Sequence, residues 1–250
     1  MASAAPVLLL DQTDSTNAEA RRRAEAGETG PLWITARRQT AGRGRRGRSW
    51  ESDTGNLFGT LLLTTRKSPA EAAQITFIAA LAVADLLDAY APPSLVTIKW
   101  PNDVMLAGEK ASGVLVESGA HPAGGLWLAV GIGVNLASAP EGTERPATSL
   151  AQHLRVDVAA PPPTDEAARR LAQAFAVWLD RWSTLGFEPV LDAWTARTTG
   201  LDGPAVARLG HETIEGRAEG VAPDGALRLR LADGALRLIS AGDVFFGEAA

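Results

Sequence analysis

The sequence predicts an α+β fold in which a mixed or antiparallel sheet is backed by helices, followed by a small β-barrel. Up to Asn135, the apolar segments typical of strands come in runs joined by short turns, as in a sheet built from hairpins. From about Gly203 the pattern changes to short alternating segments with tight turns at Asp224-Gly225 and Asp233-Gly234. We therefore expect two domains, residues 1–200 and residues 201–250.

The composition excludes several kinds of site. The 250-residue chain has no cysteine, which excludes disulfides, thiolate metal sites and a cysteine nucleophile, and fits a reducing cytoplasm. Its three histidines are far apart, so we expect no histidine metal site. The net charge of −5 argues against a chain that binds nucleic acid over its whole surface. Asp85 interrupts the longest apolar run, and Val7–Leu10 lacks the basic flank of a signal peptide, so we expect no membrane segment.

Hydrophobic periodicity predicts the individual elements. Ala70–Tyr90 carries apolar residues three and four apart, which predicts one helix. A helix from Thr164 or Asp165 carries a stripe that we interpret as core: Leu171, Phe175, Trp178, Trp182 and Leu185. The other expected helices are Ala18–Ala26 and Phe187–Arg197. Strands are expected at Val7–Leu10 (buried), Leu32–Ala36, Asn56–Leu63, Leu95–Lys99, Asp103–Leu106, Lys110–Glu117, Leu126–Asn135, Ala205–Leu209, Thr213–Val221, Ala226–Leu231, Ala235–Ile239 and Val244–Phe246.

The tripeptide Ser15-Thr16-Asn17 lies between the first expected strand and the first expected helix. These residue types are common helix N-caps, and capping alone is the simpler interpretation. The alternative is that the side chains and the free N–H groups of the first helical turn bind a polar ring of a ligand.

The loop from Arg37 to Trp50 concentrates positive charge, with six arginines, three glycines and no acidic residue. Glycines let the backbone approach a ligand, and guanidinium groups bind phosphate or carboxylate oxygens in pairs. Trp50 offers a flat face for stacking a base. The pattern is compatible with an anion-binding active-site loop, a nucleic-acid-binding loop or an inert basic loop.

The segment Lys99-Trp100-Pro101-Asn102-Asp103 ends an expected strand. Alternation puts Trp100 on the apolar face of that strand and Lys99 on the opposite face. A turn at Ala107-Gly108 returns the chain to Lys110, so a hairpin brings two lysines, an amide and a carboxylate together. A surface hairpin with solvated charges is the alternative.

The expected strand Leu126–Asn135 carries small residues on one face, at Ala129, Gly131 and Gly133. Such a face leaves room for a ligand against the backbone, or equally for a close helix–sheet contact. The Gly-x-Gly is not a dinucleotide-binding fingerprint, because the third glycine and the following helix are missing.

Together these stretches resemble the biotin–protein ligase (biotin–acetyl-CoA-carboxylase ligase) family. The resemblance covers nearly the whole chain and implies a class II synthetase-like catalytic domain with an SH3-like C-terminal barrel. Because the first strand begins near Val7, we expect no N-terminal winged helix, and hence a ligase that does not bind DNA. The matching segments are Ser15-Thr16-Asn17, Gln39–Trp50, Lys99–Asp103, Lys110–Glu117 and Gly131–Asn135.

The resemblance also implies a two-step reaction. The carboxylate of biotin attacks the α-phosphorus of ATP to form biotinyl-5′-AMP, and a lysine of a biotin carboxyl carrier protein then displaces AMP. The implied substrates are biotin and ATP with Mg²⁺ on its phosphates, and the implied location is the cytoplasm. We expect no protein metal site and neither a DNA nor a membrane partner.

Site residues carried over by the resemblance fall into two overlapping sets. Biotin is expected to contact Ser15, Thr16, Asn17, Gln39, Gly42, Arg43, Gly44, Arg45, Lys110 and Gly113. ATP or the adenylate is expected to contact Arg43, Arg45, Arg46, Trp50, Lys99, Asn102, Lys110 and Asn135, with Trp50 stacked on adenine. Lys99, Arg45 and Lys110 are the catalytic candidates, with Lys99 at the α-phosphate, because an anion attacking an anion needs positive charge in the transition state.

The resemblance further implies that the arginine–glycine loop acts as a lid over the reactive intermediate. Two other functions stay open from the sequence. One is a lipoate or octanoate transferase or ligase of the same architecture, and the other is an RNA-binding protein that uses the arginine loop.

Overall fold

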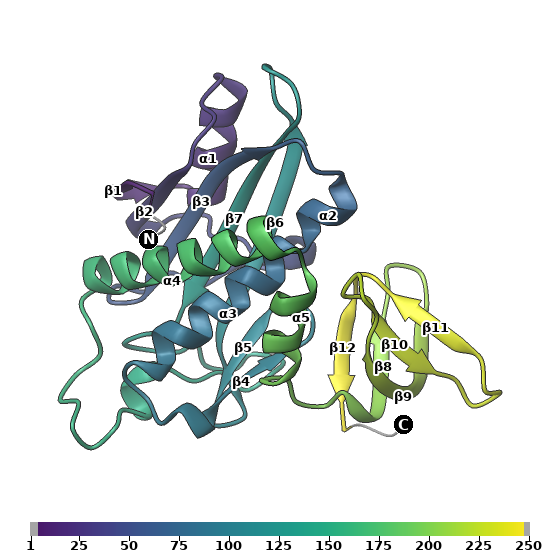
Figure 1. Ribbon diagram of the computed structural model, residues 1–250. Helices are drawn as coiled ribbons and strands as arrows, with labels where there is room; N and C mark the ends of the chain where they lie inside the picture. The colour runs from purple at the N-terminus through teal and green to yellow at the C-terminus, as the bar shows by residue number, and fades with distance from the viewer. Residues whose placement is uncertain (1–4, 248–250) are drawn as a thin grey trace.

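The computed structural model describes residues 5–247, which form two sheets and their covering helices (Figure 1). The first sheet contains β1 (Val7–Thr13), β2 (Leu32–Gln39), β3 (Leu57–Thr65), β4 (Val96–Lys99), β5 (Asp103–Leu106), β6 (Glu109–Ala120) and β7 (Leu126–Val134). The helices are α1 (Thr16–Glu25), α2 (Pro69–Ala73), α3 (Ile75–Asp88), α4 (Thr164–Leu185) and α5 (Glu188–Thr195), with short 3-10 helices η1 (Arg45–Gly47), η2 (Pro93–Leu95) and η3 (Leu150–Gln152). The second sheet contains β8 (Asp202–Arg208), β9 (Thr213–Val221), β10 (Leu227–Arg230), β11 (Leu236–Ile239) and β12 (Asp243–Phe246).

The first sheet has seven strands in the order β1-β2-β3-β7-β6-β5-β4. β1 and β2 are parallel, and the other neighbouring strands are antiparallel, which confirms the predicted mixed sheet. Adjacent side chains on a strand point to opposite faces. Leu61 accordingly packs in the main core with α3 and α4, whereas Leu62 packs in a smaller core with Ala20 and Ala24 of α1. The sheet is therefore covered on both faces, with α3 and α4 on one and α1 on the other.

The structure corrects three details of the predicted elements. β1 is not buried: Val7 and Leu9 are 39% and 44% exposed, because β1 is the edge strand and has one neighbour. The helix expected over Ala70–Tyr90 is broken at Gln74, which ends α2 and starts α3. Leu185 is 63% exposed, because it lies in the last turn of α4, beyond the core that the rest of the stripe contacts.

The stretch Pro69–Asp88 is long and apolar enough to cross a membrane by length and composition alone. Here it forms α2 and α3, and α3 is the central helix of the main core. Ile78, Leu81 and Leu87 are fully buried, and α3 contacts the first sheet together with α4 and α5. Burial on all sides explains its apolar composition.

The C-terminal strands form a second, antiparallel sheet in the order β11-β10-β9-β8-β12, as the alternating segments predicted. Figure 1 shows this sheet beside the end of the first sheet that carries β4, β5 and helix α5. The indole N–H of Trp100 donates to the carbonyl oxygen of Gly225 at 3.0 Å and joins the two parts. The division into residues 1–200 and 201–250 stays a prediction.

Candidate active site

One cavity of about 280 Å³ lies over the face of the first sheet that α1 covers. Its wall includes the N-terminus of α1, the arginine–glycine loop, the β4–β5 turn, strands β6 and β7, and the segment Gly242–Val244 before and within β12. Residues from every motif that the sequence singled out therefore contribute to one site. The predicted site residues that line it are Ser15, Thr16, Asn17, Gln39, Arg43, Gly44, Arg45, Trp50, Asn102, Lys110, Gly113 and Asn135.

We call the part formed by Ser15, Thr16, Asn17 and Gln39 the neutral end. Ser15 is the N-cap residue of α1, yet its side chain makes no capping hydrogen bond. The amide oxygen of Gln39 caps the helix instead, accepting from the Thr16 N–H at 2.9 Å and the Thr16 hydroxyl at 3.2 Å. The interpretation of Ser15 as a side-chain cap is therefore wrong, and its buried hydroxyl remains available to the cavity.

Asn17 is held in one orientation from four directions. Its amide nitrogen donates to Glu117 at 2.8 Å and to the Leu115 carbonyl at 3.3 Å. The fully buried hydroxyl of Thr60 donates to its amide oxygen at 2.7 Å and lies 2.8 Å from the Thr16 hydroxyl. A Cβ at Gly131 would overlap the same amide. The neutral end is thus fixed before any ligand arrives.

The small residues of β7 accommodate side chains of the site. Gly131 leaves space for Asn17 in the first turn of α1, which is a close helix–sheet contact. Gly133 leaves space for the indole of Trp50, and a Cβ at Gly113 would lie 3.1 Å from the same ring. The buried indole N–H of Trp50 has no hydrogen-bond partner within residues 5–247. The close helix–sheet contact is therefore found at Gly131, whereas room for a ligand against the backbone stays a prediction.

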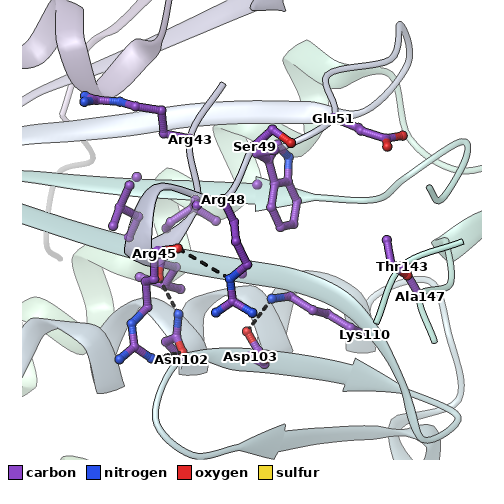
Figure 2. A pocket seen from close by; sticks show the side chains of 18 of the residues that line it. Arg43, Arg45, Arg48, Ser49, Glu51, Asn102, Asp103, Lys110, Thr143 and Ala147 are labelled. Atoms are coloured by element: carbon purple, nitrogen blue, oxygen red, sulfur yellow. Dashed lines mark hydrogen bonds and ion pairs between the residues drawn. The ribbon is translucent and has the colours of Figure 1, made fainter. Parts of the chain in front are cut away.

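We call the part formed by Arg45, Arg48, Lys110 and Arg145 the cationic end. Lys110 Nζ lies 2.7 Å from Asp103 Oδ1, and Arg145 Nη1 lies 3.6 Å from Asp103 Oδ2. Figure 2 shows Arg45, Arg48 and Lys110 gathered around Asn102 and Asp103, whereas Arg43 extends away from this group. The predicted hairpin forms, with Lys99, Asp103 and Gly113 paired across β4, β5 and β6, and it brings Asn102, Asp103 and Lys110 to the cavity wall.

Arg45 is half-buried and its charge is not neutralised locally. It donates to the amide oxygen of Asn102 at 2.9 Å and to the carbonyl oxygen of Gly242 at 3.2 Å. Among the described residues, no carboxylate lies within 4.0 Å of it, and burial lowers its pKa although Asp243 and Asp103 oppose this. A guanidinium bound to neutral oxygens keeps its attraction for an incoming anion.

The arginine–glycine loop is a hairpin tied to the C-terminal sheet. Trp50 N–H donates to the Gly42 carbonyl at 3.0 Å and closes the hairpin. At its tip, Arg46 and Arg48 bind Asp243 at 3.2 Å and 2.9 Å. Burial raises the pKa of Asp243, but the opposing effect of Arg48 and Arg46 together is larger. The pKa of this carboxyl therefore lies below its usual value. We call this contact the latch.

Three predicted residues do not line the cavity: Gly42, Arg46 and Lys99. Gly42 and Arg46 support the loop through the contacts above. Lys99 lies on the cavity face of the sheet, as alternation predicted, with its Nζ 5.9 Å from the ring centroids of Phe245 and Phe246. Its assignment to the α-phosphate stays a prediction.

Sequence reasoning missed several residues of this site. Arg48 lies within the arginine loop and was not singled out, and Thr60 lies in an apolar strand with no polar neighbour pattern. Arg145 and Asp243 lie in segments without a recognisable motif. Within residues 5–247, no group of three histidine, aspartate or glutamate residues could hold a metal ion.

The comparisons with known proteins agree with this geometry. Residues 9–136 match the biotin/lipoate A/B protein ligase family, and residues 206–247 match the biotin protein ligase C-terminal domain. A biotin–[acetyl-CoA-carboxylase] ligase of Paracoccus denitrificans is 44% identical over 241 residues, covering 96% of this chain and 100% of that protein. The ligase of the same name from Mycobacterium tuberculosis is 32% identical, covering 93% and 86%.

Among solved structures, the biotin protein ligase from Aquifex aeolicus in complex with biotin and ATP superposes with a TM-score of 0.80. The two sequences are 24% identical, and the match covers 97% of this chain and 99% of that one, so the two proteins share the whole fold. The predicted fold class is thereby confirmed. This chain belongs to the biotin/lipoate A/B protein ligase family.

Proposed function

We propose that this protein is an ATP-dependent biotin–protein ligase. It forms biotinyl-5′-AMP and transfers biotin to a lysine of a carrier protein. The observation that carries the proposal is that one cavity joins a neutral end to a cationic end, with motif residues from distant parts of the chain in its wall. The 44% identity to a biotin–[acetyl-CoA-carboxylase] ligase supports it.

The neutral end suits the uncharged bicyclic ring of biotin. It offers side-chain hydroxyl and amide groups of both polarities on a rigid frame, and no ionised group is needed to bind a ureido ring. Asn17 is oriented by Thr60 and Glu117, and Gln39 by Thr16, so little side-chain entropy is lost on binding. We assign the ring of biotin to this end, with its carboxylate directed toward Lys110.

In the first step the biotin carboxylate attacks the α-phosphorus and pyrophosphate leaves. Two anions must approach, so positive charge has to be placed before the reaction. We assign Arg45 and Lys110 to the reacting carboxylate and phosphate oxygens. We retain Lys99 as the candidate for the α-phosphate, because it shares a cross-strand row with Asp103 and Gly113 on the cavity face.

In the second step the amine of a carrier lysine attacks the acyl carbon, and AMP leaves with the bonding electron pair. The mixed anhydride must be protected from water until then. We assign this task to the arginine–glycine loop, with Trp50 offered to the adenine. The two ends of this loop are hydrogen-bonded to each other, and its glycines allow the backbone between them to move, as a lid requires.

Magnesium fits the site as part of the substrate. The described residues hold no carboxylate cluster for a resident ion, and Asp103 in the cavity wall is already paired with two cations. Mg²⁺ is therefore expected to enter on the phosphates of ATP. We propose the cytoplasm as its location, since ATP is made available there, and the biotin-accepting carrier of acetyl-CoA carboxylase as the protein substrate.

Calorimetry with biotin and with lipoate, each with and without ATP, tests the proposal. Biotin is expected to bind without ATP, and the protein is expected to release pyrophosphate from ATP when Mg²⁺ and ATP are added to biotin. Lipoate is expected neither to bind nor to cause pyrophosphate release. Activation of lipoate in place of biotin would replace the proposal with the lipoate alternative. Binding of RNA that weakens steeply with salt, without biotin binding, would favour the RNA-binding alternative.

A further inference from the structure

Arg145, in the segment between β7 and η3, makes three contacts that converge on the cationic end. Its Nη1 lies 3.6 Å from Asp103 Oδ2, and its Nη2 donates to the Val244 carbonyl in β12 at 3.1 Å. Its guanidinium stacks on the ring of Phe245, with Cζ 4.1 Å from the centroid. One side chain thus joins the C-terminal sheet to the carboxylate that binds Lys110.

Asp103 is shared between two cations. Oδ1 binds Lys110 Nζ at 2.7 Å, and Oδ2 faces Arg145. The Asp103 side chain is only 10% exposed, so its charge is costly to leave unpaired. If Lys110 turned toward a substrate oxygen in a site without Arg145, it would leave behind a buried, uncompensated carboxylate.

The backbone fixes Arg145 relative to Lys110. The Lys110 N–H donates to the Pro146 carbonyl at 3.0 Å, and the Thr148 N–H donates to the Lys110 carbonyl at 3.0 Å. The segment that follows Arg145 therefore runs beside Lys110 as a short parallel bridge. Arg145 cannot move far without moving the strand that carries Lys110.

We propose that Arg145 is a positioning residue for biotin activation: it holds Asp103 so that Lys110 can exchange this carboxylate for the reacting oxygens. This inference rests on the proposed ligase function and deepens it. With Arg145 present, the three groups carry one net positive charge, and Asp103 stays paired after Lys110 leaves. Without it, Lys110 and Asp103 form a neutral pair that attracts an anion weakly.

The test uses the full-length protein and single-turnover release of pyrophosphate from biotin and ATP. Arg145→Ala is expected to slow adenylate formation by about 10- to 100-fold, because the buried Asp103 carboxylate then has no second cation when Lys110 turns to the substrate. Arg145→Lys is expected to recover much of the rate, because it keeps the charge near Asp103. The affinity for biotinol, in which an alcohol replaces the carboxylate, is expected to stay within about threefold in both, since the neutral end is unchanged.

A double-mutant cycle separates positioning from direct contact with ATP. In an Asp103→Asn background the carboxylate is gone, so adding Arg145→Ala is expected to change the rate by less than about threefold. If Arg145 instead bound phosphate directly, its removal would cost the same in both backgrounds, and the inference would be overturned.

Arg208→Ala is the matched control. Arg208 stacks on the same Phe245 ring, with Cζ 4.2 Å from the centroid, but its ion pair is with exposed Glu144 rather than with Asp103. The rate of adenylate formation in Arg208→Ala is expected to match that of the wild type. A loss as large as that of Arg145→Ala would show that packing on Phe245 matters, and would also overturn the inference. An inactive wild-type enzyme would instead refute the proposed function.

Discussion

The neutral end and the cationic end of the cavity are built in opposite ways. At the neutral end, side chains from α1, β2 and β3 hydrogen-bond one another, and Asn17 has partners on two strands, β3 and β6. At the cationic end, Asp103 holds Lys110 and Arg145, and Asp243 holds Arg48, whereas Arg45 is bound to neutral oxygens.

The difference suggests how the two ends are used. A neutral network satisfied within the protein is rigid, and it selects a ligand by shape and hydrogen-bond pattern. Where an internal carboxylate holds a cationic group, the carboxylate occupies the position of a substrate anion, and the substrate anion can replace it. We expect substitutions at the neutral end to act on affinity and those at the cationic end to act on rate.

Lys110→Ala should give the largest effect. Removing the amine at the reacting oxygens is expected to slow adenylate formation by about 10²- to 10³-fold, as loss of one preorganised charge-stabilising donor does. Binding of biotinol, which lacks the carboxylate, should change little. Pyrophosphate release and calorimetry measure the two quantities. Lys67→Ala is the control, because Lys67 pairs with Glu71 at the surface. An unchanged rate in Lys110→Ala would remove the distinction between the two ends.

Gly131→Ala should give the next largest effect, and at the other end. The new Cβ overlaps the Asn17 amide, which must shift. Overpacking of this kind costs about 1–3 kcal/mol, so biotin affinity is expected to fall by about 10- to 100-fold. Gly203→Ala is the control, because a Cβ there meets nothing within 4 Å. Wild-type affinity in a folded Gly131→Ala protein would mean that the orientation of Asn17 is unimportant.

Thr60→Val should weaken biotin binding more modestly. The substitution keeps the shape and removes the hydroxyl that donates to Asn17. The expected loss of affinity is about 3- to 10-fold, in line with about 1 kcal/mol for one hydrogen bond. Thr60→Ser keeps a hydroxyl and should recover the affinity measured by calorimetry. Equal losses in the serine and valine variants would point to packing rather than to hydrogen bonding.

Asp243→Asn should give the smallest effect on catalysis, below about fivefold, since partly exposed ion pairs contribute about 1 kcal/mol or less. It should raise hydrogen exchange of the loop amides between Arg43 and Trp50. Because the native pKa of Asp243 is lowered, the latch contributes fully above the ordinary aspartate pKa of about 3.8 and is lost as the pH falls through the lower native value.

The asparagine variant should therefore lack this acid-dependent step in loop protection, after correction for intrinsic exchange. Asp11→Asn serves as the comparison, because Asp11 is almost fully exposed and pairs only with Arg37 among the described residues. If the wild-type and Asp243→Asn loops exchanged alike at neutral pH, the latch would not order the loop.

Local patterns in the sequence predicted most strands and helices, and the family resemblance assigned residues at both ends of the cavity to one site. The alternation that put Lys99 opposite Trp100, and the small-residue face at Gly131, are properties of a strand and its immediate neighbours. Burial of β1 was predicted wrongly, because a run of apolar residues does not reveal which strand ends at the sheet edge.

The residues that the sequence did not reveal depend on contacts between distant segments. Arg48 meets Asp243 across 195 positions of chain, and Arg145 meets Val244 across 99. No periodicity relates such pairs, since loops of any length can bring them together at little extra entropic cost. The role of Ser15 was similarly ambiguous until the contact of Gln39 with Thr16 was known.

Gly131 and Gly133 contribute only backbone to the cavity wall, beneath Asn17 and the Trp50 indole, and backbone has no rotamers to adjust. An analogue larger than biotin can bind only if the arginine–glycine loop or the neutral end moves. Selection for such analogues should therefore yield changes in the Arg43–Trp50 hairpin or at Ser15–Asn17, and leave β7 untouched.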